Sequence, residues 1–124
     1  MKSHIPGISG RVALVTGASR GIGSAVVKLF AEQGANIVVN YVSDESAASQ
    51  TVADAEACGV NARAIRADVS TVEDANRLVK ETVEHFGRLD FLVCNAGIWE
   101  GREVEAISEE LWDRTQAINL KGTW

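Results

Sequence analysis

The feature that most constrains the fold of this chain is a repeated change of hydrophobic period. Continuous apolar runs of strand length, such as 12–15, alternate with segments in which apolar residues recur at helical spacing, such as 22–30. A continuous apolar run is typical of a strand covered on both faces, and strands that alternate with helices form parallel sheets through right-handed crossovers. The sequence therefore predicts an open α/β domain: a doubly wound parallel sheet with about four strands, whose ligands bind at the carboxyl ends of the strands.

The expected element boundaries follow from residues that start or end helices. Gly34, Gly59 and Gly87 each follow a helical segment, and glycine is the residue that most often ends a helix. Ser108 is expected to cap the last helix, in which Asn119 lies. We expect strands at 12–15, 37–39, 62–67 and 89–94, with helices near 22–30, 47–55, 72–86 and after 108.

The third of these helices carries the strongest signals. Ser70 and Glu73 have the spacing of a capping box, in which two side chains satisfy free amides at the helix start. The face expected to pack against the sheet consists of Val72, Ala75, Val79, Val83 and Phe86.

Composition and charge narrow the range of partners. The chain is 46% hydrophobic and 23% charged, which is typical of a globular domain, and its net charge of −5 comes without a basic patch. We therefore expect neither nucleic acid nor a membrane as a partner. Residues 1–10 lack the apolar stretch of a signal peptide and are interpreted as a loose N-terminal tail before a domain at 11–124, and we expect a cytoplasmic location. The spacing of Cys58 and Cys94 predicts no metal site, and both are interpreted as packing residues.

A glycine-rich loop joins the first strand to the first helix. Gly17 is expected to permit the tight turn out of the strand, Gly21 to let a pyrophosphate approach the backbone, and Gly23 to let the helix pack close to the sheet. The start of the helix then offers free amides and a positive dipole end to phosphates. The alternative is an ordinary glycine-rich turn without a ligand.

Through this loop and three later motifs, the chain resembles the short-chain dehydrogenase/reductase family. The segment Thr16-Gly17-Ala18-Ser19-Arg20-Gly21-Ile22-Gly23 is similar to the family's TGxxxGxG motif. Three later features also match the family in order: Asp68-Val69 after the third strand, Asn95-Ala96-Gly97 after the fourth, and Asn119 in the next helix. The resemblance spans about 11–124 and implies a Rossmann-type fold that binds a nicotinamide dinucleotide. It is nearest to members that reduce 3-oxoacyl thioesters or oxidise sugars and polyols.

The form of the cofactor is predicted from the end of the second strand. An NAD site usually places a carboxylate there to bind the ribose 2′-hydroxyl, but this chain has no acid before Asp44. Arg20 in the glycine loop is expected to pair with a 2′-phosphate, and Asn40 and Ser43 to donate neutral hydrogen bonds to it. The sequence therefore predicts NADP(H), in agreement with the resemblance. The alternative for Arg20 is a solvated surface charge.

The family resemblance also implies roles for the later motifs. Asp68 is expected to accept a hydrogen bond from the adenine amino group, although a helix cap near Ser70 is the alternative. Asn119 is expected to be a catalytic-site residue, whose carbonyl places a water in a proton relay, unless it is a polar residue on an exposed face. The residues expected to bind the cofactor are Gly17, Ser19, Arg20, Gly21, Ile22, Gly23, Asn40, Tyr41, Ser43, Asp68, Val69, Asn95, Ala96 and Gly97.

The family's proton donor has no counterpart in this sequence. Family members protonate the carbonyl with a tyrosine in a Tyr-x-x-x-Lys motif, assisted by a serine. The single tyrosine here, Tyr41, has Glu45 at the lysine position. We interpret the chain as a truncated cofactor-binding part of an NADP(H)-dependent oxidoreductase acting on a small-molecule ketone or secondary alcohol, which binds cofactor without turnover. A homo-oligomer is expected. The alternatives are a noncatalytic dinucleotide-binding module and a fragment that completes its sheet with another chain.

Overall fold

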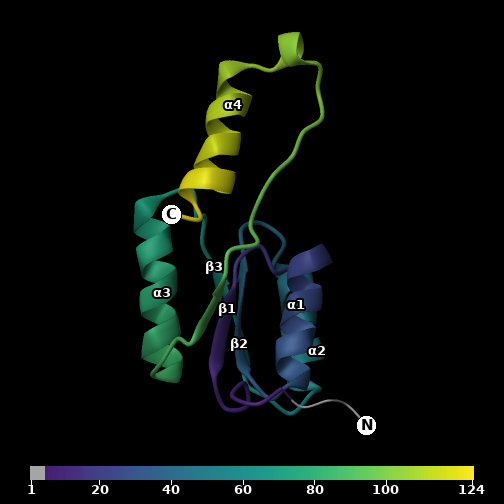
Figure 1. The fold of residues 1–124 in the computed structure, drawn as a ribbon, viewed down its shortest axis with the longest axis vertical. Coiled ribbons are helices and arrows are strands. Elements are labelled where there is room, and N and C mark those ends of the chain that lie inside the picture. Colours follow the sequence, from purple (N-terminus) through teal and green to yellow (C-terminus); the bar gives the residue numbers. More distant parts are fainter. Residues whose placement is uncertain (1–4) are drawn as a thin grey trace.

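The computed structural model describes residues 5–124 and contains one parallel sheet with the strand order β3–β2–β1–β4. Helices α1 and α2 cover one face of this sheet and α3 covers the other (Figure 1). The predicted doubly wound α/β fold is therefore confirmed. The strands are β1 (Val12–Val15), β2 (Asn36–Tyr41), β3 (Ala62–Arg66) and β4 (Phe91–Val93), and the helices are α1 (Gly21–Glu32), α2 (Glu45–Glu56), α3 (Val72–Phe86), the 3-10 turn η1 (Val104–Ala106), α4 (Glu109–Gln116) and the π-helical turn η2 (Ala117–Lys121).

The central strand β1 explains why the core has two halves. All four of its residues are buried, and successive side chains of a strand point to opposite faces. Ala13 and Val15 pack on the side of α1 and α2, whereas Leu14 packs with Leu78 of α3 on the other side. Leu92 of β4 pairs with Leu14 in the parallel register and therefore lies on the α3 face.

The start of α3 differs from the expected capping box. The helix is capped by Thr71, whose hydroxyl oxygen accepts the amide of Asp74, so the prediction of Ser70 and Glu73 was wrong by one residue. The reason is that the carboxylate of Asp68 accepts both the amide and the hydroxyl of Ser70, which holds Ser70 in a turn before the helix. The end of α3 was predicted correctly at Gly87, where φ is 77°.

The packing face of α3 also differs from the predicted one. Leu78 and Thr82 are its buried residues, whereas Val72, Val79 and Val83 are 58%, 39% and 42% exposed. The helix is rotated so that Leu78 reaches the cluster around Leu14, and the three predicted valines face outward. Of the other two predicted residues, Phe86 does pack against this cluster and Ala75 is half-buried. Leu92 on the neighbouring edge strand β4 is also half exposed. An apolar surface therefore lies uncovered along α3 and β4 in the described part of the chain.

Two smaller expectations are corrected. Residues 5–10 are not a loose tail, because Ile8 packs against the core and the amide of Gly10 donates to the carbonyl of Gly34. The first four residues of the predicted tail lie outside the described residues.

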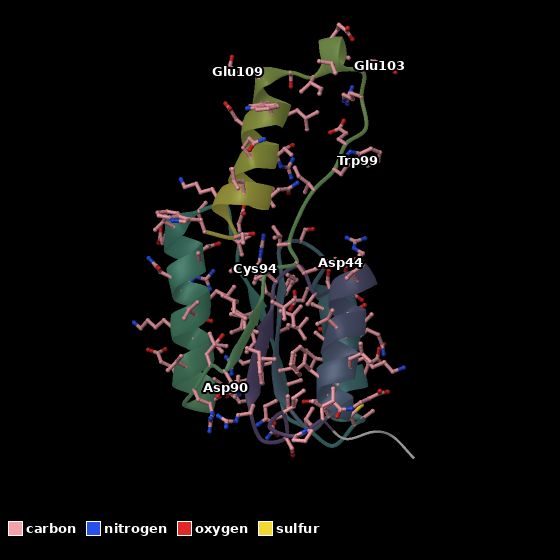
Figure 2. The ribbon with its side chains drawn as sticks, in the orientation of Figure 1. Asp44, Asp90, Cys94, Trp99, Glu103 and Glu109 are labelled. Atoms are coloured by element: carbon pink, nitrogen blue, oxygen red, sulfur yellow. The ribbon has the colours of Figure 1, made fainter. Side chains whose placement is uncertain are left out.

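Cys58 and Cys94 are exposed rather than packed, and Figure 2 shows Cys94 where the chain leaves β4. No helix in residues 5–124 combines the length and hydrophobicity needed to cross a bilayer.

Candidate functional site

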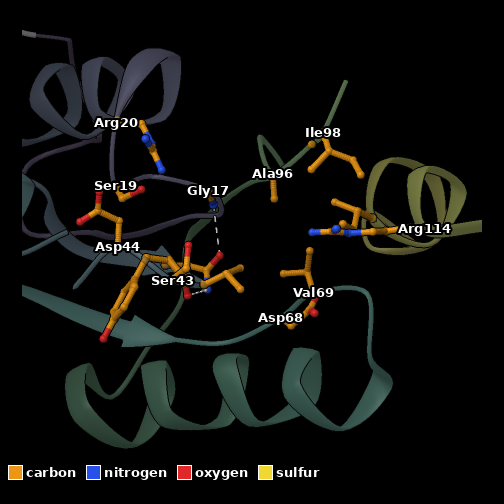
Figure 3. A pocket seen from close by; sticks show the side chains of 15 residues that line it. Gly17, Ser19, Arg20, Ser43, Asp44, Asp68, Val69, Ala96, Ile98 and Arg114 are labelled. Atoms are coloured by element: carbon orange, nitrogen blue, oxygen red, sulfur yellow. Dashed lines mark hydrogen bonds between the residues drawn. The ribbon is translucent and has the colours of Figure 1, made fainter. Parts of the chain in front are cut away.

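A cavity of about 410 Å³ opens at the carboxyl ends of the four strands (Figure 3). It lies where the strand order reverses, with β2 on one side of β1 and β4 on the other, which is the place where open α/β sheets bind ligands. Each strand contributes the residues that follow or end it, and α4 and η2 close the remaining side. The lining residues are Gly17, Ser19, Arg20, Asn40, Tyr41, Val42, Ser43, Asp44, Asp68, Val69, Ala96, Gly97, Ile98, Arg114 and Ile118.

The start of α1 differs from the starts of the other α-helices. Asp44, Thr71 and Ser108 each cap their helix by accepting a backbone amide. At α1 the cap position is Arg20, which makes no such bond, and the first turn contains no acidic residue. The free amides and the positive end of the helix dipole are thus left for a ligand, and anions are the ligands that such helix starts bind.

Gly17 and Gly23 of the loop must be glycine for two different structural reasons. Gly17 has a φ of 59°, and a Cβ there would lie 2.8 Å from the Cα of Ala96. Gly23 has an ordinary φ, but a Cβ would collide with the carbonyl oxygen of Gly17 and lie 2.7 Å from the side-chain nitrogen of Asn95. Both positions therefore exclude any larger residue. The glycine loop therefore packs against the loop that follows β4. The close neighbours of Gly23 belong to these two loops rather than to the strands, as the prediction for the helix and the sheet had it.

Asn40 has a different role from the one expected. Its side-chain oxygen accepts the amide of Gly17 at 3.1 Å, and its side-chain nitrogen donates to the carbonyls of Ile65 and Ala67 at 3.3 and 3.0 Å. The residue is 1% exposed. Because these donors are used within the protein, the prediction that Asn40 donates to a 2′-phosphate is wrong. The side chain instead ties the glycine loop to β2 and β3.

The ends of β1 and β4 are held together by a second set of polar contacts. The hydroxyl oxygen of Thr16 accepts the amides of Asn95 and Ala96, each at 3.0 Å. The side-chain nitrogen of Asn95 donates to the carbonyls of Thr16 and Gly17, each at 3.1 Å. Asn95 therefore fixes the relative position of the two loops, and it does not line the cavity itself.

Asp68 lies in the turn before α3 and also lines the cavity, while its contact with an adenine stays a prediction. One of its carboxylate oxygens accepts the amide of Ser70 at 3.0 Å, in a turn that precedes α3. The residue also lines the cavity. Its own amide donates to Asp74 at 2.7 Å; this hydrogen bond, followed by the one from Arg77, lowers the pKa of the Asp74 carboxyl. The loop after β3 is thereby tied to the first turn of α3.

One acidic residue lines the part of the cavity next to the glycine loop. Asp44 lies near Ser19 and Arg20 in Figure 3, and one of its oxygens is bound to the amide of Ala47 at 2.9 Å as the cap of α2. Ser43 precedes it and lines the same side of the cavity, and Tyr41 ends β2 there. Figure 3 shows the side chain of Arg20 directed toward the cavity.

Asn119 lies in η2, directly beside the loop that follows β4. Its side chain accepts the amide of Ile98 and donates to the carbonyl of the same residue, both at 2.8 Å. A π-helical turn in an α-helix is frequent at functional sites. Asn119 does not line the cavity, but its side-chain oxygen would be 3.3 Å from a Cβ placed on Gly97.

Most of the predicted site residues are brought together by the fold. Ten of the predicted residues line the cavity. The five that lie outside the lining are Gly21, Ile22, Gly23, Asn95 and Asn119. The sequence reasoning missed Val42, Asp44, Ile98, Arg114 and Ile118. For the last two a signal existed, because residues four apart share a helix face and both precede Asn119 closely. No group of three His, Cys, Asp or Glu side chains among residues 5–124 is arranged to hold a metal.

A comparison with protein families matches the short chain dehydrogenase model to residues 11–124. The chain belongs to the short chain dehydrogenase family. The match covers the glycine loop, the Asp68-Val69 segment, the loop after β4 and Asn119, so the resemblance read from the sequence is confirmed.

Individual proteins and solved structures are similar to this chain over nearly its whole length. Versicolorin reductase 1 of Aspergillus parasiticus is 44% identical over 115 residues, which cover 93% of this chain and 44% of that protein. A short chain dehydrogenase of Burkholderia cenocepacia, solved in complex with NADP, has a TM-score of 0.90 and 37% identity over 93% of this chain and 47% of its own. A blue fluorescent protein from a metagenomic library, in complex with NADPH, has a TM-score of 0.87 and 38% identity, covering 93% of this chain and 47% of its own. The chain spans about half the length of these relatives.

Proposed function

We propose that this chain binds NADP(H) in the cavity at the carboxyl ends of its strands, as the cofactor-binding part of a short chain oxidoreductase. The observation that carries this proposal is the start of α1, which has no side-chain cap and directly follows Ser19 and Arg20 of the cavity lining. Its free amides and positive dipole end therefore lie at the edge of the cavity. A pyrophosphate is an anion suited to such a helix start. The cavity continues from there to the loops after β2, β3 and β4, which gives room for the adenosine part of a dinucleotide.

The choice of NADP(H) over NAD(H) rests on Arg20 and Asp44. Arg20 makes no ion pair among residues 5–124, so its charge is available for a 2′-phosphate. Asp44 is the acid nearest to the end of β2, and one of its oxygens is already engaged in capping α2. Ser43 supplies a neutral hydroxyl on the same side of the cavity. A cationic side chain and a hydroxyl at this place favour a ligand with a 2′-phosphate over one with a free ribose 2′-hydroxyl.

The bound cofactor would supply or accept a hydride, and we propose a ketone or secondary alcohol as the reaction partner. The residues of this chain hold and orient the dinucleotide: the free amides at the start of α1 bind the pyrophosphate, Arg20 the 2′-phosphate and Asp68 the adenine. The single tyrosine is Tyr41, which lacks a lysine four residues later. We therefore propose that the 124-residue chain binds the cofactor without catalysing turnover.

Titration of the chain with NADPH and NADH, followed by nucleotide fluorescence, tests this proposal. The wild-type chain is expected to bind NADPH more tightly than NADH. Arg20→Ala is expected to weaken NADPH binding by about 1.5–3 kcal/mol and to leave NADH binding nearly unchanged. Equal losses for both nucleotides would contradict the role of Arg20. Absence of binding by the folded wild-type chain would contradict the proposed function and favour a fragment that only completes a sheet.

The proposal about turnover has its own measurement. With NADPH bound, addition of a ketone is expected to produce no loss of absorbance at the nicotinamide band. Oxidation of NADPH that depends on the ketone and on the chain would show that another group supplies the proton.

A further inference from the structure

We propose that Arg114 of α4 binds the adenine base of the cofactor by placing its guanidinium plane over the ring. This inference rests on the proposed function, since it assigns a part of the same cofactor to a residue that the glycine loop does not include. Arg114 lines the cavity, and Figure 3 shows its side chain extending from α4 into the cavity, on the wall opposite Arg20 and Ser19.

The first argument is that the charge of Arg114 has no partner within the described chain. Arg11, Arg77, Arg88 and Arg102 each form an ion pair with a carboxylate. No side-chain hydrogen bond or ion pair of Arg114 occurs among residues 5–124, although acidic residues are more numerous than basic ones in this chain. A lone arginine directed into a cavity is therefore available to a ligand.

The second argument concerns which part of the ligand Arg114 faces. The loops after β1 and β2 carry the groups that suit phosphates. These groups are the start of α1, Arg20 and Ser43. Arg114 belongs to the other wall, where the neighbouring lining residues are apolar and Asp68 is the one acid. An apolar wall with a single acidic hydrogen-bond acceptor suits a base better than a phosphate. The apolar residues that line this wall are Val69, Ala96, Ile98 and Ile118.

The third argument is that α4 is held in place next to this wall. The two 2.8 Å hydrogen bonds between the side chain of Asn119 and the backbone of Ile98 join the segment after α4 to the loop after β4. Arg114 lies one turn before Ile118 on the same helical face, and both line the cavity. The planar guanidinium of arginine stacks on aromatic rings, so this placement favours contact with the face of a base.

Because adenine is common to NADPH, NADH and ADP, the inference predicts an equal effect on all three. Arg114→Ala is expected to weaken the binding of each by a similar factor, about 5- to 30-fold. Arg114→Lys retains the charge near the end of α4 but lacks the planar group, so it is expected to recover only a small part of this loss. The contrast with Arg20→Ala, which is expected to affect NADPH alone, separates the two arginines.

The experiment is a titration of the 124-residue chain and its variants with NADPH, NADH and ADP. Lys121→Ala is the matched control, since it removes the same charge from η2 but lies outside this cavity. Unchanged binding by Arg114→Ala would overturn the inference, and so would a loss confined to NADPH, which would place Arg114 on the 2′-phosphate. Full recovery by Arg114→Lys would also overturn it, because charge alone would then be sufficient. A folded wild-type chain that binds none of the three nucleotides would overturn the proposed function, and this inference with it.

Discussion

The side-chain amide of Asn119 makes two hydrogen bonds to the backbone of Ile98, one as an acceptor and one as a donor, each 2.8 Å long. The two residues are 21 positions apart, and their contact fastens η2 to the loop that leaves β4. This contact explains why an asparagine stands in a helical segment, where asparagine is otherwise unfavourable. The side chain of Asn119 thus positions the wall of the cavity, whereas its predicted part in catalysis stays a prediction.

Replacement of Asn119 tests this positioning role. Asn119→Ala removes both hydrogen bonds and is expected to lower the free energy of unfolding by about 1 kcal/mol, because both partners are solvent-accessible. Hydrogen exchange of the Ile98 amide is expected to become faster. Asn119→Asp keeps the acceptor for the Ile98 amide but places a second oxygen against the Ile98 carbonyl, so it is expected to protect the amide only in part. Unchanged exchange in both variants would contradict the positioning role.

Replacement of Gly17 tests whether the glycine loop depends on close packing as well as on backbone conformation. Gly17→Ala introduces a Cβ 2.8 Å from the Cα of Ala96 and forces an L-residue into a φ of 59°. Gly59→Ala is the matched control, because its φ is 86° and nothing lies within 4 Å of its Cβ. The control is expected to lose about 1–2 kcal/mol of stability from backbone strain alone, and Gly17→Ala clearly more. Thermal and urea unfolding of both variants measure the difference, and equal losses would show that the contact with Ala96 adds nothing.

The pH dependence of stability is expected to involve Asp90, at the end of the sheet opposite the cavity (Figure 2). The side chain of Arg88 donates to this carboxylate, the amide of Val12 donates as well, and Arg11 forms an ion pair with it at 3.1 Å. Hydrogen bonding by Arg88, opposed in part by desolvation, holds the pKa of Asp90 far below its ordinary value of 3.8. A carboxyl whose pKa is lower in the folded state stabilises the fold above the unfolded-state pKa and loses this effect as the pH falls through the folded-state pKa.

Asp90→Asn is therefore expected to be less stable than the wild type at pH 7, and the difference is expected to shrink as the pH falls below about 4. Urea unfolding between pH 7 and pH 2 measures this trend. Asp113→Asn on the exposed surface of α4 serves as the control for loss of one negative charge. A difference between wild type and Asp90→Asn that stays constant with pH would show that the charge of Asp90 is not responsible.

The uncovered surface of α3 and β4 is expected to drive self-association of the chain. Strand β4 is an edge of the described sheet, and Leu92 on it is 53% exposed on the face that α3 covers. Exposed apolar edge strands pair readily with other chains. Sedimentation velocity is expected to show association that increases with concentration, and Leu92→Lys is expected to reduce it. A wild-type chain that sediments as a monomer at high concentration would contradict this expectation.

The amino-acid sequence by itself determined the fold class, the glycine loop and the helix ends at Gly34, Gly59 and Gly87. These features depend on local hydrophobic period and on backbone conformations that few residues adopt, so neighbouring residues are sufficient to predict them. The sequence also located most of the cavity lining, because parallel strands bring the residues at their carboxyl ends to one edge.

Tertiary structure decided the features that depend on partners far away in the chain. Asn40 resembles a ligand-binding residue at the end of a strand, but contacts with Gly17, Ile65 and Ala67 engage its side chain within the protein. The packing face of α3 was set by the position of Leu14 in a neighbouring strand, which outweighed the valine pattern of the helix itself. The placement of Arg114 in the cavity depends on the hydrogen bonds of Asn119 to a loop 21 residues earlier, and no local pattern predicts how such distant segments meet.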